Sequence, residues 1–152
     1  MRYMLLCYDD EKAWEKAGKA AHGEAIQEAV RLTHEIDARG QYLVASPLHP
    51  VSKATSVRVR GGKRLVTDGP FAETREILGG FYLIDVPDLD EAIRIAGRHP
   101  GARLGTVEIR PLREIEGLPR TTQTENHESS PAGAAPGVEQ RKRPKRSKGE
   151  SR

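Results

Sequence analysis

A histidine and an aspartate far apart in the sequence have the residue types of a proton-transfer pair. His22 precedes Ile26 by four residues and shares the apolar side of a predicted helix with Val30 and Thr33. Such a histidine would be partly desolvated against a sheet. The helix amino terminus would also favour its neutral form, which can act as a base. A structural histidine with a satisfied hydrogen bond would show the same pattern, so both interpretations remain open.

Asp68 is the candidate partner of this histidine. It follows a predicted strand over residues 63–67 and precedes Gly69 and Pro70. Its carboxylate would therefore stand at a strand end, where it could orient the imidazole and stabilise the imidazolium. The alternative is an Asx-turn, in which the carboxylate accepts hydrogen bonds from nearby backbone N–H groups, and the residues alone favour it.

Three further residues are candidates for contact with a substrate. Tyr8 and Phe71 could line an aromatic pocket, and Glu73, in the loop after Asp68, could line it as well. The alternatives are that the aromatic side chains belong to a core and that Glu73 is an ordinary solvated charge.

The other histidines and the single cysteine give no sign of a metal or nucleotide site. His34 and His99 are expected at the surface, and His49 is undecided. Cys7 lies in a predicted strand, where a buried thiol is inert. The sequence contains none of the spacings HxH, HxxxH, CxxC, GxGxxG or the P-loop pattern, so no metal and no cofactor are expected.

The elements that position these residues follow from the apolar periodicity of residues 1–116. The predicted order is strand 2–8, helix 19–39, strand 41–45, a hairpin of strands 54–60 and 63–67 around a Gly-Gly pair, strand 80–86, a helix capped by Asp88, and strand 106–110. This order predicts a ferredoxin-like α+β sandwich, with both helices on one face of an antiparallel sheet. The first strand is apolar on both sides, so a second copy should cover the helix-free face in a homodimer.

The helices are expected to bury apolar stripes against that sheet. The stripe of the first helix would consist of Ile26, Ala29, Val30, Thr33 and Ile36, and that of the second helix of Leu89, Ile93 and Ala96.

Charge separates a near-neutral domain from a basic tail. Residues 1–116 hold 17 Lys and Arg against 18 Asp and Glu, whereas residues 117–152 hold 8 against 4. The domain itself therefore lacks the basic face of a nucleic-acid-binding protein. The tail is rich in small and polar residues and is expected to be disordered. Its basic run over residues 141–148 could contact nucleic acid weakly, or it could be a solvated end.

No segment has the pattern of a signal peptide, and no apolar run reaches the length of a membrane span, so a cytoplasmic location is expected.

Several of these segments together resemble one family. The stretch VTDGPFAETREILGGFYLIDVPDLDEAIRIAGRHP, the amino-terminal MRYMLLCYDD and the closing VEIRPL are similar to the YCII-related, or DGPF, family over residues 1 to 113. The resemblance implies a dimeric α+β barrel and a site with a histidine–aspartate pair, here His22 and Asp68. It also implies two kinds of function. One is a small enzyme, and the other is a ligand-binding or regulatory protein associated with an extracytoplasmic-function sigma factor.

Overall fold

The computed structural model describes residues 1–118, so the predicted tail from residue 119 onward, with its basic run, lies outside the described part. Two short 3-10 turns, η1 (Val51–Lys53) and η2 (Pro100–Arg103), accompany the regular elements. The helices and strands are β1 (Arg2–Asp9), α1 (Glu11–Ala38), β2 (Tyr42–Pro47), β3 (Thr55–Arg60), β4 (Lys63–Asp68), β5 (Ile77–Asp85), α2 (Leu89–Arg98) and β6 (Gly105–Pro111).

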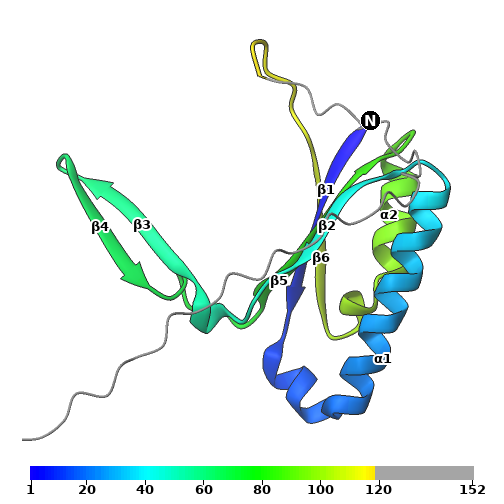
Figure 1. Cartoon of the computed structure of the whole chain (residues 1–152), viewed down its shortest axis with the longest axis horizontal. Coiled ribbons are helices and arrows are strands. Elements are labelled where there is room, and N and C mark those ends of the chain that lie inside the picture. Colours follow the sequence, from blue (N-terminus) through cyan, green and yellow to red (C-terminus); the bar gives the residue numbers. More distant parts are fainter. Residues whose placement is uncertain (119–152) are drawn as a thin grey trace, which may run out of the picture. The chain divides into compact units, whose positions relative to one another are not determined.

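Four strands form an antiparallel sheet in the order β2-β5-β1-β6, and both helices cover one face of it (Figure 1). This is the arrangement of a ferredoxin-like α+β fold, with the β3–β4 hairpin inserted between β2 and β5. The predicted fold class is therefore confirmed for the single chain, while the homodimer remains a prediction. Within residues 1–118, neither helix has the length and apolar character that crossing a bilayer requires.

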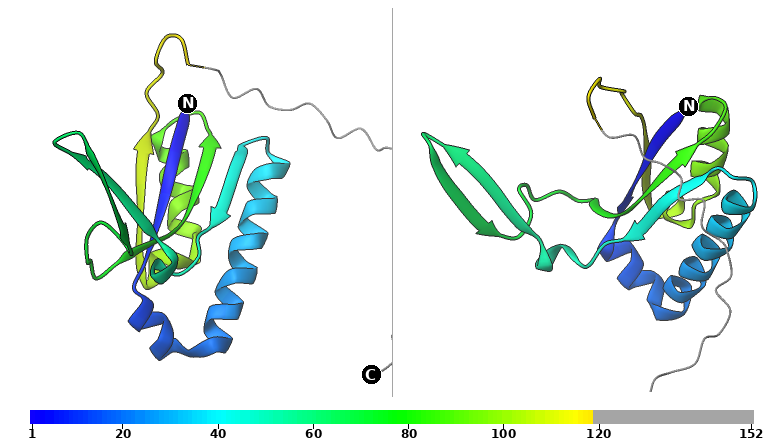
Figure 2. Two further views of the ribbon diagram at one scale, coloured as in Figure 1. Left: turned by 60° about the vertical axis from the view of Figure 1, so that its left-hand side comes forward. Right: turned by 45° about the horizontal axis from the view of Figure 1, so that its top comes forward.

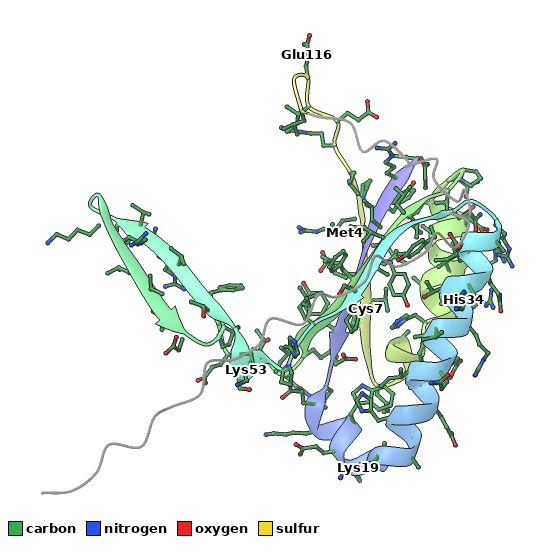
Figure 3. All side chains as sticks on the ribbon, viewed as in Figure 1. Met4, Cys7, Lys19, His34, Lys53 and Glu116 are labelled. Atoms are coloured by element: carbon green, nitrogen blue, oxygen red, sulfur yellow. The ribbon has the colours of Figure 1, made fainter. Side chains whose placement is uncertain are left out.

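The core lies between the helices and the central strands. Tyr3, Leu5 and Cys7 of β1 point toward the helices and are buried, together with Ile36 of α1 and Ile84 of β5. The intervening residues of β1, among them Met4, point to the side without helices and are only half-buried (Figure 3). In the single chain, the helices therefore cover only one side of β1, and the opposite side remains half-exposed.

Helix α1 has a break at Gly18, where φ is +90°. Asp10 begins the helix by accepting a hydrogen bond from the backbone N–H of Ala13 at 3.1 Å. The segment after the break buries Leu32 and Ile36 as an amphipathic helix should. Ile26 and Val30 of the predicted stripe instead remain 50% and 44% exposed, so that part of the prediction is wrong.

Helix α2 begins at the predicted cap, where Asp88 accepts from the backbone N–H of Glu91 at 2.9 Å. Its buried residues are Ala92, Ile95 and Ala96. Leu89 and Ile93 are exposed, so the predicted stripe was correct only at Ala96. The sequence spacing allowed either side of this short helix to face the sheet, and the side with Ala92, Ile95 and Ala96 is the one packed into the core.

The β3–β4 hairpin forms a separate two-stranded sheet that extends away from the four-stranded one (Figure 2). Gly61 and Gly62 have φ values of +55° and +75°, as the predicted primed turn requires. Apolar side chains of both strands are half or more exposed, namely Val57, Val59, Leu65 and Val66. A lone two-stranded hairpin is marginally stable, so these side chains are suited to cover by another surface.

Candidate active site

A cavity of about 970 Å³ opens between residues 11–33 of α1 and the helix-covered side of the sheet. This volume lies within the range of small-molecule sites. Its walls are mainly apolar, and Ile26, Ala29 and Val30 of α1 belong to them. Their exposure thus has a physical reason, because they face the cavity rather than packed side chains. Polar groups also reach it, among them Asp9, His22, Thr33, Tyr42, Tyr82 and His99. His49, which the sequence left undecided, lines it too, as do the charged residues Glu11, Glu15 and Lys19.

Asp9 is the last residue of β1 and lines this cavity. Its Oδ1 accepts a hydrogen bond from Trp14 Nε1 at 3.2 Å. A Cβ built on Gly79 would stand 2.0 Å from Asp9 Oδ2, so the carboxylate lies where any larger residue would need its side chain. Gly79 is also the extra residue of a β-bulge, because Cys7 and Tyr8 pair with Gly80 and Leu78.

The neighbouring Asp10 has a structural role. It is buried and joins the start of α1 to the loop before β5, because Arg75 Nε donates to its Oδ2 at 3.1 Å. The hydrogen bond from the Ala13 backbone, and then that from Arg75, hold the pKa of Asp10 below its usual range.

His22 lies at the rim of the cavity, four residues after the break at Gly18. Its ring is 5.4 Å from that of Trp14, at an interplanar angle of 44°. Its side chain makes no hydrogen bond to another residue of 1–118. The sequence predicted a partly desolvated His22, whereas the side chain is exposed. The indole that Asp9 holds therefore supports an imidazole whose nitrogens are open to a ligand.

Asp68 is the last residue of β4, opposite Thr55. The turn after it is held by Gly69 N, which donates to Ala54 O at 2.7 Å, and by Ser56 Oγ, which donates to Gly69 O at 2.8 Å. Within residues 1–118 no group donates to the Asp68 carboxylate, so the favoured Asx-turn is not formed. Within one chain, Asp68 neither lines the cavity nor bonds to His22.

The predicted substrate contacts also lie outside the cavity of the single chain. Phe71 is 78% exposed in the loop after β4, and Glu73 is exposed in the same loop. Tyr8 is on the side of β1 opposite Cys7. Contact of these three residues with a substrate therefore remains a prediction. The pairing of Asp68 with His22 also remains a prediction, and it would require Asp68 from a second copy of the chain.

His99 is the site residue that the sequence did not reveal, and its predicted place at the surface is wrong. It is partly buried, with its ring against the ring of Tyr82 at 5.4 Å. Its Nδ1 accepts from the backbone N–H of Gly101 at 3.1 Å, and its Nε2 lies 3.9 Å from Cys7 Sγ. Burial lowers the pKa of His99, while Asp9 and then Glu28 oppose that effect. A Pro-Gly pair after a helix-terminal histidine was the available signal, since that turn folds back onto the sheet.

Cys7 and Tyr82, the side chains that contact the His99 ring, are neutral. Burial, and then the charge of Asp9, raise the pKa of the Cys7 thiol to about 12. Burial also raises the pKa of Tyr82. Within residues 1–118, no three His, Cys, Asp or Glu side chains come together as a group that could hold a metal ion.

The profile of the YCII-related domain matches residues 1–116. The chain belongs to the YCII-related family. An uncharacterised protein of Rhizobium meliloti (strain 1021) is similar to it, with 39% identity over 124 residues that cover 74% of this chain and 92% of that protein. The match spans all the described elements, so the cavity between α1 and the sheet belongs to the YCII-related domain.

Proposed function

We propose that this YCII-related protein binds a small, largely apolar organic molecule in the cavity and that His22 transfers a proton to or from it. The observation that carries the proposal is the position of His22. It stands at the rim of an apolar cavity and has no hydrogen-bond partner within residues 1–118. A positioned general base or acid accelerates proton transfer by about 10²- to 10⁴-fold.

Trp14 gives His22 its orientation in this proposal. Asp9 fixes the indole through the Nε1–H bond at 3.2 Å, and the indole packs against the imidazole. The carboxylate therefore acts on His22 through the indole rather than by direct contact. Isomerase, lyase and hydrolase reactions that begin with removal of a proton all fit this arrangement.

A homodimer would complete the site. Met4, Val44 and Leu83 face the side without helices, and Val44 is 42% exposed. A second copy is the simplest cover for such a face. Because the β3–β4 hairpin extends away from its own sheet, we infer that Asp68 meets the His22 of the other copy. The hairpin would then also shield the rim of the cavity from water.

The sole tryptophan of the chain, Trp14, makes the proposal testable because its emission reports on the cavity. Small aromatic and alicyclic compounds are screened by this emission, and the hits are followed for turnover by NMR. We expect His22→Ala to lower turnover about 10²-fold or more while the hits still bind. His34→Ala, an exposed histidine of the same helix, is the control. Wild-type turnover in His22→Ala would overturn the proposal.

A ligand-binding regulator is the second candidate, and the exposed apolar residues of the hairpin favour it. Val57, Val59 and Val66 would then contact a partner protein, such as an extracytoplasmic-function sigma factor, when the cavity is occupied. Copurification of a sigma factor with wild-type protein, and its loss in Val66→Glu, would favour regulation. Turnover of a hit by the purified protein would favour catalysis.

A further inference from the structure

We propose that the part of the cavity beside His99 is a subsite for the carbonyl oxygen of a neutral, largely apolar compound, bound by the Nε2–H group of His99. This inference rests on the proposed function, because it assumes that the cavity holds a ligand, and it names the chemical class of that ligand.

The tautomer of His99 follows from its backbone contact. The Gly101 N–H group donates to Nδ1 at 3.1 Å, so Nδ1 is an acceptor and carries no hydrogen. In a neutral imidazole the hydrogen must then be on Nε2. Its only partner within residues 1–118 is Cys7 Sγ at 3.9 Å, and a thiol sulfur is a weak acceptor. The Nε2–H group therefore has most of its hydrogen-bonding capacity left.

Three neutral donors near His99, namely Thr33, Tyr82 and Trp14, already have acceptors. Thr33 Oγ1 donates to Ala29 O at 2.8 Å, so the hydroxyl of Tyr82 must be the donor in its 3.1 Å contact with Thr33. The Nε1–H group of Trp14 donates to Asp9. Apart from the weak thiol, two side chains of the cavity near Tyr82 can therefore still donate to a ligand. They are His99 and Tyr42, whose hydroxyl accepts from Ala45 N at 3.0 Å and donates to no group within residues 1–118.

The charges around His99 select a neutral ligand. Asp9 Oδ1 and His99 Nδ1 lie 3.5 and 3.0 Å from the same point, the position that a Cβ would take on Gly101. Glu28 is paired with Arg103 through two hydrogen bonds, at 3.1 and 2.7 Å. Asp9 therefore contributes the unbalanced charge beside His99, and it would repel a carboxylate. A ketone, aldehyde or amide oxygen accepts a hydrogen bond without that repulsion.

Three probes of similar size separate these possibilities: acetophenone, benzoate and ethylbenzene. They are titrated into the full chain labelled with ¹⁵N at histidine, and long-range ¹H–¹⁵N spectra report the state of each ring. We expect His99 in the Nε2–H tautomer and a shift of its Nε2 signal with acetophenone, but no shift of His34. Acetophenone should bind about five- to tenfold more tightly than ethylbenzene, as one hydrogen bond provides, and benzoate most weakly.

A substitution and its rescue add a second measurement. His99→Phe should make acetophenone and ethylbenzene bind equally, and His99→Gln, which keeps a side-chain N–H donor, should restore part of the difference. If the variants do not fold, the wild-type spectra still decide. An Nδ1–H tautomer, equal binding of the two neutral probes, or preferred binding of benzoate would overturn the subsite while leaving cavity binding intact. Failure of all three probes to bind would count against the proposed function as well.

Discussion

The carboxylate of Asp9 occupies the space that a side chain at Gly79 would need, with only 2.0 Å between Asp9 Oδ2 and the position of a Cβ. Gly79, the first glycine of the Gly-Gly pair in β5, is thus needed for the arrangement of side chains in the cavity. It makes room for the group that holds Trp14, and Trp14 in turn supports His22.

Gly79→Ala should therefore affect both stability and the cavity. The methyl group forces the Asp9 carboxylate to turn, which breaks its bond to Trp14 Nε1. We expect a loss of about 1 kcal/mol in the free energy of unfolding and a shift of Trp14 emission, measured by urea titration and fluorescence.

Two other glycines calibrate this result. A Cβ on Gly97 of α2 meets nothing within 4 Å, so Gly97→Ala should be neutral or stabilise by up to about 1 kcal/mol. A Cβ on Gly105 would stand 2.0 Å from the backbone oxygen of Tyr8, which cannot rotate away, so Gly105→Ala should cost about 3 kcal/mol. Equal effects at all three glycines would contradict the steric argument.

The pH dependence of stability should reveal His99. Burial lowers its pKa in the folded protein, whereas the unfolded chain binds a proton near the ordinary value of 6.5. Below that pH the unfolded state holds more protons, so stability falls as the pH decreases and is fully present above it. Urea titrations between pH 7.5 and 5.5 should show this slope, which His99→Gln flattens and the exposed His34→Gln retains. An unchanged slope in His99→Gln would assign the effect to other groups.

The reactivity of Cys7 tests the packing between β1 and the helices. With a pKa raised from 9.0 to about 12, the thiolate fraction at pH 8 is about a thousandfold smaller than in an unperturbed thiol. Reaction with Ellman's reagent should therefore be slow in the folded protein and rapid in urea. Cys7→Ser provides the blank, since Cys7 is the one cysteine in the chain. Rapid labelling of folded protein would show that β1 is accessible.

The sequence was informative wherever a local rule decides the structure. The Gly61-Gly62 pair specifies a primed turn, and both residues have positive φ. Asp88 caps α2 because its side chain can reach the N–H of Glu91. Together with strand alternation, such rules were enough for the order of elements and the fold class.

The sequence was less informative wherever tertiary packing determines the environment of a side chain. Periodicity indicates that Ile26 and Val30 face the sheet, but it cannot show that a cavity lies between them. His99 looked exposed because the fold of the turn η2 beneath it depends on tertiary contacts. The tie between Asp9 and Trp14 requires the bulge at Gly79, which alternation does not predict.

The homodimer can be tested on the helix-free face. Val44→Glu places a charge where we expect the second copy, so the protein should sediment as a monomer at micromolar concentration. Ile93→Glu is the matched control, because Ile93 is 51% exposed on α2 and outside that face. A monomeric wild-type protein, or dissociation caused by both variants alike, would be evidence against this interface.

Mixing two inactive variants tests whether the site is shared between subunits. If Asp68 of one copy serves His22 of the other, a heterodimer of His22→Ala and Asp68→Asn contains one intact site. Because half of the randomly mixed dimers are such heterodimers, and one of their two sites is intact, turnover of a screened substrate should recover to about a quarter of the wild-type rate. Within a single chain the two residues are not bonded to each other, and a pair formed inside one chain would give no recovery on mixing. Each variant mixed with itself is the control, and the persistence of dimers is checked by sedimentation.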